Sequence, residues 1–159
     1  MDFKIGFGYD VHQLVDNRDF VLGGIKIDFD KGLLGHSDAD VVIHAICDSI
    51  LGALNMGDIG SNFPDNDSKF KDIDSKILLG KVKKLMFLKG YNINNIDVTI
   101  CLQSPKINQY ILKMKSCLSK ILEIENSQLS LKATTTEKLG FVGRGEGVSC
   151  YSVVLIKKM

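Results

Sequence analysis

Residues 38–54 read DADVVIHAICDSILGAL, and this stretch decides which fold the sequence can adopt. The spacing predicts a helix that is apolar on almost every side, and such a helix must be buried. One polar stripe interrupts it, formed by Asp40, His44 and Asp48 at intervals of four residues. Because residues four apart share a helix face, this stripe faces something other than an apolar core.

Strand patterns and further helices lie on both sides of the buried helix. Alternation predicts strands at Phe3–Tyr9, at Phe20–Leu22 and Ile25–Phe29 joined as a hairpin by Gly23-Gly24, at Ile96–Leu102, at Leu129–Ala133 and at Val148–Ile156. Helices are predicted at about Ser75–Lys89 and from Ser104-Pro105 to about Ile121, with Ser37 or Asp38 capping the central helix and loops at residues 30–37 and 57–72. Residues 134–147 read as a loop or one helical turn.

This order of elements predicts a single α+β domain over residues 1–159. A mixed β-sheet is expected with helices packed on one face and a small β-hairpin beside it. The last predicted strand is apolar on both faces, which indicates cover on each side by helices or by another subunit.

Composition and charge exclude several classes of protein. A chain of 159 residues with 45% apolar and 25% charged residues has the composition of an ordinary globular protein, which argues against disorder. The net charge of +1 removes the electrostatic footprint of a nucleic-acid binder. No window is apolar enough to cross a membrane, and the N-terminal residues do not resemble a signal peptide. We therefore expect no nucleic-acid or membrane partner and a cytoplasmic location, or the plastid stroma if a transit peptide has been removed.

The four cysteines favour a reducing compartment. Cys47, Cys101, Cys117 and Cys150 are far apart and form no C-x-x-C pair. They are predicted to be buried or half-buried free thiols; a zinc site or a disulfide framework built on them is the weaker alternative.

One set of residues could hold a metal ion. Asp10 and His12 are two apart in a strand pattern, so their side chains point the same way. With His44 they would form a site of two imidazoles and one carboxylate, typical of catalytic Zn²⁺. Asp40 or Asp48 could then hold the free ring nitrogen of His44. Spacing alone favours a simpler interpretation, in which His44 is a core histidine and Asp10 a turn residue.

Three further segments carry polar groups. Residue spacing alone does not decide what these groups do. His36 precedes the helix cap and could meet an anion or simply face solvent. Residues 57–67 form an acidic loop that could grip a polyol or be solvated. In residues 133–147, three threonines precede a glycine-rich run with Lys138 and Arg144. That run could approach a phosphate, with Glu137 holding a cation such as Mg²⁺, or could be a flexible connection.

Taken together, these stretches resemble a known family. Gly6–His12, Gly35–Val41 with His44, Gly57–Gly60 with Phe63-Pro64-Asp65, and Ala133–Gly147 are similar to the motifs of the 2-C-methyl-D-erythritol 2,4-cyclodiphosphate synthase family of the non-mevalonate isoprenoid pathway, in the same order. The last stretch is long and specific. The resemblance raises the metal interpretation of Asp10, His12 and His44 above the structural alternative.

The resemblance implies a reaction and a set of roles. The 2-phosphate of 4-diphosphocytidyl-2-C-methyl-D-erythritol 2-phosphate would attack the β-phosphorus of its own diphosphate, giving the cyclic diphosphate and CMP. By resemblance, Asp10, His12 and His44 bind Zn²⁺ or another divalent transition metal, and Glu137 binds Mg²⁺ or Mn²⁺ with the substrate phosphates. His36 and Thr135 would steady the transition state. The implied substrate contacts are Asp10, His12, His36, Ser37, Asp58, Ile59, Gly60, Phe63, Asp65, Asp67, Leu102, Ser104, Pro105, Lys106, Ile107, Asn108, Ala133, Thr134, Thr135, Thr136, Glu137, Phe141 and Arg144.

The resemblance also implies a homotrimer with active sites between subunits. Phe7, Tyr9, Arg144 and Glu146 would line a cavity on the trimer axis that could take an isoprenoid diphosphate. Some relatives carry histidine at the position of Phe7, which leaves the ligand of that cavity open. Two other functions remain as alternatives: a metal-dependent phosphohydrolase that activates water, and a non-enzymatic trimeric module that binds isoprenoid diphosphate.

Overall fold

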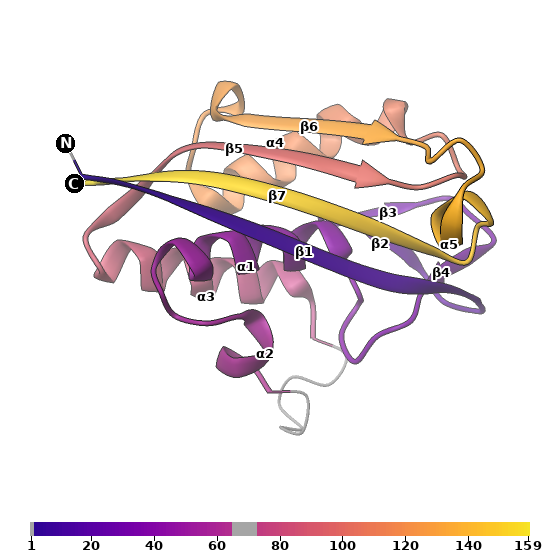
Figure 1. The fold of residues 1–159 in the computed structure, drawn as a ribbon, viewed down its shortest axis with the longest axis horizontal. Coiled ribbons are helices and arrows are strands. Elements are labelled where there is room, and N and C mark those ends of the chain that lie inside the picture. The colour runs from indigo at the N-terminus through magenta and orange to yellow at the C-terminus, as the bar shows by residue number, and fades with distance from the viewer. Residues whose placement is uncertain (1, 65–72) are drawn as a thin grey trace.

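Five strands form one mixed sheet in the computed structural model, which describes residues 2–64 and 73–159. The strand order is β4-β1-β7-β5-β6, and only β5 and β6 run parallel (Figure 1). The strands are β1 (Phe3–Asp16), β4 (Lys31–Leu33), β5 (Tyr91–Cys101), β6 (Leu129–Thr134) and β7 (Gly147–Lys158). The remaining two strands, β2 (Phe20–Leu22) and β3 (Ile25–Ile27), form the predicted hairpin, whose turn residues Gly23 and Gly24 both have positive φ.

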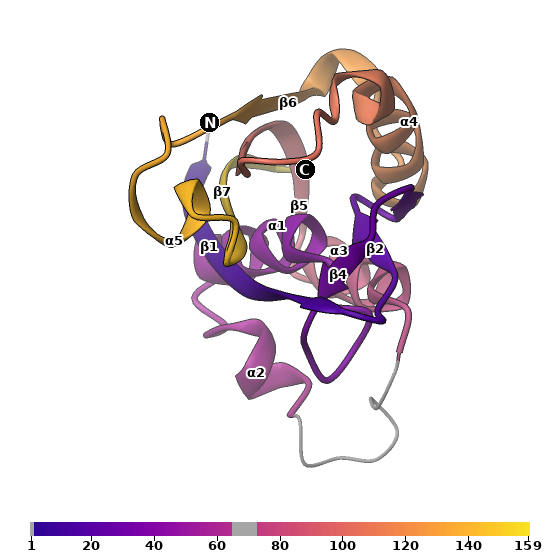
Figure 2. The same ribbon diagram turned by 90° about the vertical axis from the view of Figure 1, so that its right-hand side faces the viewer.

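The main helices lie on one side of this sheet. Figure 2 shows α1 (Val41–Ala53), α3 (Ser75–Leu88) and α4 (Ile111–Leu122) within the curve of the strands. The short elements are α2 (Ile59–Asn62), α5 (Gly140–Gly143), η2 (Asn108–Tyr110) and η3 (Asn126–Gln128). The prediction of an α+β fold, with a mixed sheet covered by helices on one face, is confirmed.

Helix α1 is the centre of the core, as its apolar sequence predicts. Its side chains Ile43, Ile46 and Ile50 have no exposed surface. The strand β1 approaches the helix so closely that a Cβ atom at Gly8 would lie 2.0 Å from the carbonyl oxygen of Ala45. This contact fixes the distance between β1 and α1, and therefore between the polar side chains that the two elements carry.

The opposite face of the sheet is apolar and uncovered in the single chain. Its exposed large side chains are Phe3, Ile5, Phe7, Tyr9, Val11, Tyr151 and Val153. Tyr151 contacts two of these rings, with centroid distances of 5.0 Å to Tyr9 and 6.4 Å to Phe7. Cover on both faces of the last strand was predicted; within the described chain, helix α1 supplies it on one face only.

Several local predictions are wrong. Residues 30–37 contain the strand β4, which is too short to show a pattern and is set by pairing with β1. The predicted polar loop at 57–72 contains helix α2. Helix α4 begins at Ile111, not at Pro105, because Leu102 donates a hydrogen bond to the carbonyl of Thr134 (3.0 Å) and keeps the chain extended beside β6. The cap of α1 is Asp40, whose carboxylate accepts from the backbone N–H groups of Val42 and Ile43, rather than Ser37 or Asp38.

The cysteine prediction is confirmed: Cys47, Cys101 and Cys150 are buried, Cys117 is half-buried, and all four are free thiols. Among the described residues, no helix has the length and apolar character needed to span a membrane.

Candidate metal centre and its pocket

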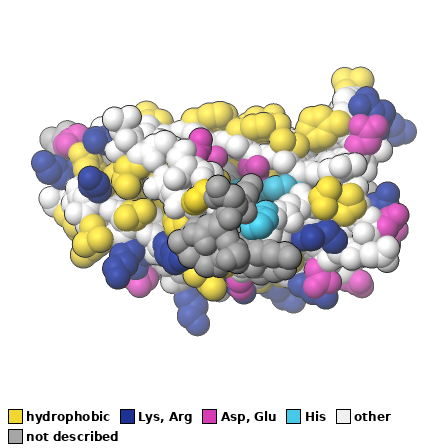
Figure 3. Space-filling view, turned by 90° about the horizontal axis from the view of Figure 1, so that it is seen from below, with side chains coloured by type: hydrophobic (Ala, Val, Ile, Leu, Met, Phe, Trp, Pro, Cys, Tyr) yellow, Lys and Arg dark blue, Asp and Glu magenta, His cyan; other side chains and the backbone are white. Residues whose placement is uncertain are grey.

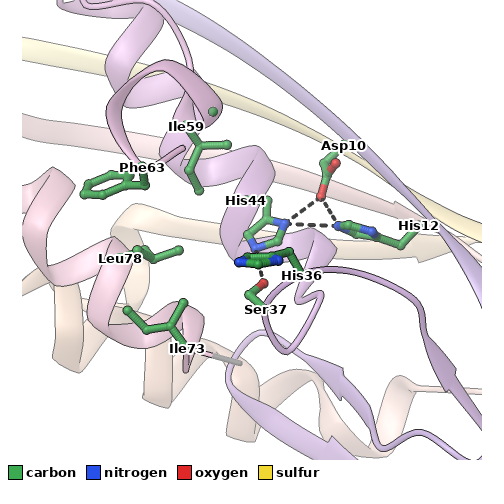
Figure 4. A pocket seen from close by; sticks show the side chains of 10 residues that line it. Asp10, His12, His36, Ser37, His44, Ile59, Phe63, Ile73 and Leu78 are labelled. Carbon is green, nitrogen blue, oxygen red and sulfur yellow. Dashed lines mark hydrogen bonds and ion pairs between the residues drawn. The ribbon is translucent and has the colours of Figure 1, made fainter. Parts of the chain in front are cut away.

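Asp10, His12 and His44 meet at one point between β1 and α1. Asp10 and His12 leave the same side of β1, as the two-residue strand period requires, and His44 projects from α1 toward them (Figure 4). Asp10 Oδ2 lies 2.9 Å from His12 Nε2 and 2.9 Å from His44 Nδ1, and the two ring nitrogens are 3.1 Å apart. Histidine side chains are visible together at the surface in Figure 3. Three ligand atoms of Zn²⁺ type therefore converge.

The electrostatics of the three groups are strongly coupled. Burial alone would raise the pKa of Asp10, but hydrogen bonds and charge interactions from His12 and His44 hold it well below its usual range. Burial alone would lower the pKa of His44, yet the Asp10 carboxylate beside it raises that pKa. Asp10 is thus ionised and available as a ligand.

Each imidazole is held from its far side. His12 Nδ1 lies 2.9 Å from the carbonyl oxygen of Leu34, so it donates there, and Nε2 is the nitrogen that faces the site. His44 Nε2 lies 3.0 Å from Ser75 Oγ and 3.3 Å from Ser37 Oγ.

The prediction that Asp40 or Asp48 holds the ring nitrogen of His44 is wrong. The Asp40 carboxylate accepts from the backbone N–H groups of Gly23 (2.9 Å) and Gly24 (2.6 Å) in addition to capping α1. Asp48 Oδ1 accepts from the backbone N–H of Ile59 at 2.7 Å. Both carboxylates accept hydrogen bonds from the backbone of neighbouring segments, because Asp40 lies beside the β2–β3 turn and Asp48 lies beside α2.

This donor set fits a divalent metal. Two imidazole nitrogens and one carboxylate oxygen converge, the far nitrogens of both rings are hydrogen-bonded, and three protein ligands leave a position for a further ligand. The geometry identifies a candidate metal site and leaves the identity of the ion open.

A pocket opens directly beside the three ligands. It is lined by Asp10, His12, His36, Ser37, His44, Ile59, Gly60, Phe63, Ile73 and Leu78 (Figure 4). Among the described residues that line it there is no lysine or arginine. His36 Nε2 is buried and has no hydrogen-bond partner among the described residues. An anion in this pocket could accept a hydrogen bond from His36 but would need a cation to balance its charge.

A second pocket brings together a further group of the predicted binding residues. Leu102, Gln103, Pro105, Lys106, Ile107, Asn108, Ala133, Thr134 and Thr135 line it, between the ends of β5 and β6 and the turn that precedes α4. No described residue lines both pockets. The predicted binding residues that line a pocket are therefore divided between two separate pockets.

Several predicted residues line neither pocket in the single chain. These are Asp58, Ser104, Thr136, Glu137, Phe141 and Arg144; Asp65 and Asp67 lie outside the described residues. Asp58 caps α2 by accepting from the N–H and hydroxyl of Ser61. Glu137 has a φ of 53° and accepts from the hydroxyl of Thr135 (3.0 Å), and Arg144 forms a two-pronged ion pair with Glu146 (2.8 and 3.0 Å).

Sequence reasoning missed three residues at the first pocket. Ile73 and Leu78 line it, and Ser75 contacts His44 from behind. Their sequence signals are those of an ordinary helix start, so nothing in the local pattern distinguishes them from core and capping residues.

Comparison with known proteins gives a consistent set of relatives. The family model described as the YgbB family matches residues 3–157. The chain is 57% identical to the 2-C-methyl-D-erythritol 2,4-cyclodiphosphate synthase of Bacteroides fragilis, over all of both chains. Among solved structures, the bifunctional IspDF of Campylobacter jejuni matches with a TM-score of 0.96 and 40% identity over 99% of this chain, which spans 43% of that longer chain. The Plasmodium falciparum IspF–CDP complex matches with a TM-score of 0.86 and 37% identity, over 98% of this chain and 96% of that one.

Proposed function

The chain belongs to the YgbB family, and from this membership we propose the reaction that its pocket serves. It converts 4-diphosphocytidyl-2-C-methyl-D-erythritol 2-phosphate to 2-C-methyl-D-erythritol 2,4-cyclodiphosphate and CMP, a step of isoprenoid precursor biosynthesis. An oxygen of the 2-phosphate forms a bond to the β-phosphorus, and the bond from that phosphorus to the bridging oxygen breaks, so CMP leaves with the electron pair. No water is consumed, which makes the enzyme a phosphorus–oxygen lyase with one catalytic domain over residues 1–159.

One observation carries this proposal: the Asp10–His12–His44 cluster opens into a pocket without a described cationic side chain. The substrate is a polyanion, and phosphoryl transfer between anions depends on positioning and charge neutralisation. A divalent ion, Zn²⁺ or a similar transition metal, when bound by these three residues would supply the positive charge at the β-phosphate. Glu137 would hold Mg²⁺ or Mn²⁺ with the phosphates.

His36 and Thr135 are the proposed transition-state contacts. His36 has a buried Nε2 without a described partner, so it can donate to a phosphate oxygen at no cost to an existing bond. The Thr135 hydroxyl, which donates to Glu137 in the single chain, can donate instead to a phosphate once Glu137 is engaged by a cation.

The remaining predicted residues are proposed to divide between the two ends of the substrate. The first pocket and the α2 segment take the erythritol, through Ser37, Asp58, Ile59, Gly60, Phe63, Asp65 and Asp67. The second pocket takes the cytidine, and the structural relative bound to CDP supports a cytidine nucleotide as ligand. Its proposed contacts are Leu102, Ser104, Pro105, Lys106, Ile107, Asn108, Ala133, Thr134 and Thr136. Phe141 and Arg144 are proposed as further substrate contacts, assigned to neither end.

Two features support assembly as a homotrimer with active sites between subunits. The two pockets share no described residue, although one substrate must occupy both. The uncovered apolar sheet face also needs a partner, and a second copy of the chain can bury it. On the trimer axis, Phe7, Tyr9, Arg144 and Glu146 are proposed to line a cavity for an isoprenoid diphosphate.

Removing the metal is expected to abolish turnover. With substrate, Zn²⁺ and Mg²⁺, ³¹P NMR should show the coupled resonances of a cyclic diphosphate together with CMP. A sample treated with chelator should show unchanged substrate, and added metal should restore the product. A linear phosphate product would instead indicate the hydrolase, and absence of turnover in folded, metal-loaded protein would indicate a binding module.

Replacing Asp48 with alanine is expected to raise KM more than it lowers kcat. The carboxylate of Asp48 ties the first turn of α2 to the helix that carries His44. A hydrogen bond to a charged group contributes about 1.5–3 kcal/mol, so KM should rise about tenfold or more as Ile59 and Gly60 lose their fixed position. Asp48→Asn keeps a carbonyl oxygen as acceptor and should retain most of the affinity. Steady-state kinetics of both variants test this, and an unchanged KM in Asp48→Ala would contradict it.

A further inference from the structure

The side of His44 that faces away from the pocket meets a buried serine. His44 Nε2 lies 3.0 Å from Ser75 Oγ. Ser75 is the first residue of α3 and has no exposed surface. A fully buried hydroxyl must satisfy its hydrogen-bonding capacity within the protein, so the partners of Ser75 are fixed by the structure and define what it does to His44.

Asp38 holds Ser75 with both carboxylate oxygens. Asp38 Oδ1 lies 2.5 Å from Ser75 Oγ, and Asp38 Oδ2 accepts from the backbone N–H of Ser75 at 3.0 Å. The N–H of Asp40 also points to Asp38 Oδ1, at 3.3 Å. Asp38, Ser75 and His44 therefore form a continuous hydrogen-bonded chain that begins at a carboxylate and ends at the candidate metal site.

The position of each proton in this chain follows from donor and acceptor counts. An ionised carboxylate can only accept, so the short contact between Asp38 Oδ1 and Ser75 Oγ must carry the hydroxyl proton of Ser75. A serine hydroxyl has one proton, and once it is given to Asp38 the oxygen can only accept from His44. His44 must then carry a proton on Nε2 to make this contact, which leaves Nδ1, 2.9 Å from Asp10 Oδ2, as the nitrogen that can face an ion.

We propose that Ser75, held by Asp38, is a positioning residue that accepts from His44 Nε2 and so holds the ring with Nδ1 toward Asp10 and His12, where a bound ion would meet that nitrogen. The effect matches that of the Leu34 carbonyl on His12, which holds a proton on Nδ1 and frees Nε2. The proposal rests on the metal site of the proposed function, because a ligating histidine needs an unprotonated nitrogen facing the ion.

Ser37 is the competing partner of His44 Nε2. Its hydroxyl lies farther away, at 3.3 Å, and already accepts from the N–H of Ala39 at 3.1 Å. Its proton could point to Nε2 only if that nitrogen were unprotonated, which is the opposite tautomer. The contact with Ser75 is closer and is supported by the Asp38 carboxylate, so Ser75 is the partner of His44 Nε2.

The ring nitrogen that binds the ion can be read directly by long-range ¹H–¹⁵N NMR of the Zn²⁺-loaded protein. The wild-type chain should show His44 protonated on Nε2. A ring that binds Zn²⁺ through Nε2 and carries its proton on Nδ1 would overturn the proposal without any variant.

Metal affinity gives the second readout, measured with Zn²⁺ alone by competition against a chromogenic chelator. Ser75→Ala should weaken Zn²⁺ binding about 10- to 100-fold, the usual effect of losing such a partner. Asp38→Asn should weaken it at least as much, because an amide N–H facing Ser75 Oγ would push the serine proton onto His44 Nε2. Ser119→Ala is the matched control: it removes a buried hydroxyl from α4 that has no described partner, and Zn²⁺ affinity should stay unchanged.

The outcomes separate this proposal from the proposed function. A wild-type chain that does not bind Zn²⁺ would contradict the metal site of the proposed function, and the positioning role with it. A wild-type chain that binds Zn²⁺, with Ser75→Ala and Asp38→Asn binding equally tightly, would overturn the positioning role. Thermal unfolding identifies any variant that fails to fold. In that case the other variant and the NMR of the wild-type chain decide whether Ser75 positions His44.

Discussion

Replacing His44 with alanine is expected to lower the rate of CMP release about a thousandfold. The change removes one of three convergent ligand atoms, and Asp10 with His12 would be left as a two-ligand site. Charge stabilisation by a bound divalent ion contributes several kcal/mol to such transfers, and about 4 kcal/mol corresponds to a thousandfold in rate. CMP formation followed by ³¹P NMR or chromatography, at saturating Zn²⁺ and Mg²⁺, measures the loss.

The fold should survive this substitution. Alanine is the best helix former, and His44 lies at the edge of the pocket with 12% of its side chain exposed, so no closed apolar cavity results. Gly52→Ala is the matched control on the same helix, because a Cβ there meets no atom closer than 3.8 Å. The control should keep wild-type turnover and Zn²⁺ affinity. Full turnover in His44→Ala would eliminate the metal assignment.

Replacing Gly8 with alanine is expected to destabilise the protein strongly. The added Cβ would lie 2.0 Å from the carbonyl oxygen of Ala45 and 2.7 Å from the backbone nitrogen of Ser49. These are backbone atoms of a buried helix, so no side-chain rotation relieves the overlap and β1 must separate from α1. We expect the free energy of unfolding to fall by at least about 3 kcal/mol, above the usual cost of overpacking.

Urea denaturation at one fixed protein concentration tests this, since the stability of the proposed homotrimer would depend on concentration. Gly80→Ala is the control: Gly80 lies inside α3, and a Cβ there meets nothing within 4 Å. That change should stabilise the protein by about 0.5–1 kcal/mol through helix propensity. A loss of less than about 1 kcal/mol in Gly8→Ala would show that β1 and α1 are less tightly fixed than the structure indicates.

Much of the fold could be predicted because its signals are local. The apolar run around Ile43, Ile46 and Ile50 predicts a central buried helix, and the structure places that helix at the core. The strand period also predicts that Asp10 and His12 share a side. What failed were short elements such as β4, which exist because a neighbouring strand pairs with them. Three residues carry too little pattern to be recognised.

The partners of polar side chains were the least predictable feature of the site. Asp40 and Asp48 stand one turn from His44 on either side, and the sequence favours them as its partners. In the structure, Asp40 instead accepts a hydrogen bond from the turn between β2 and β3, and Asp48 accepts one from the N–H of Ile59. The residue nearest to the far ring nitrogen of His44 is Ser75, which is 31 positions away in the chain and has no distinguishing local pattern.

The sequence by itself determined the α+β class, the buried central helix and, through its motifs, the family and its reaction. Only the tertiary structure decided that the predicted binding residues which line a pocket divide between two pockets, that one sheet face stays uncovered, and that Asp38 and Ser75 hold His44 from behind. The physical reason is the range of the interactions. Periodicity depends on residues two to four positions apart, whereas a buried polar atom takes whichever partner chain packing brings within hydrogen-bond distance.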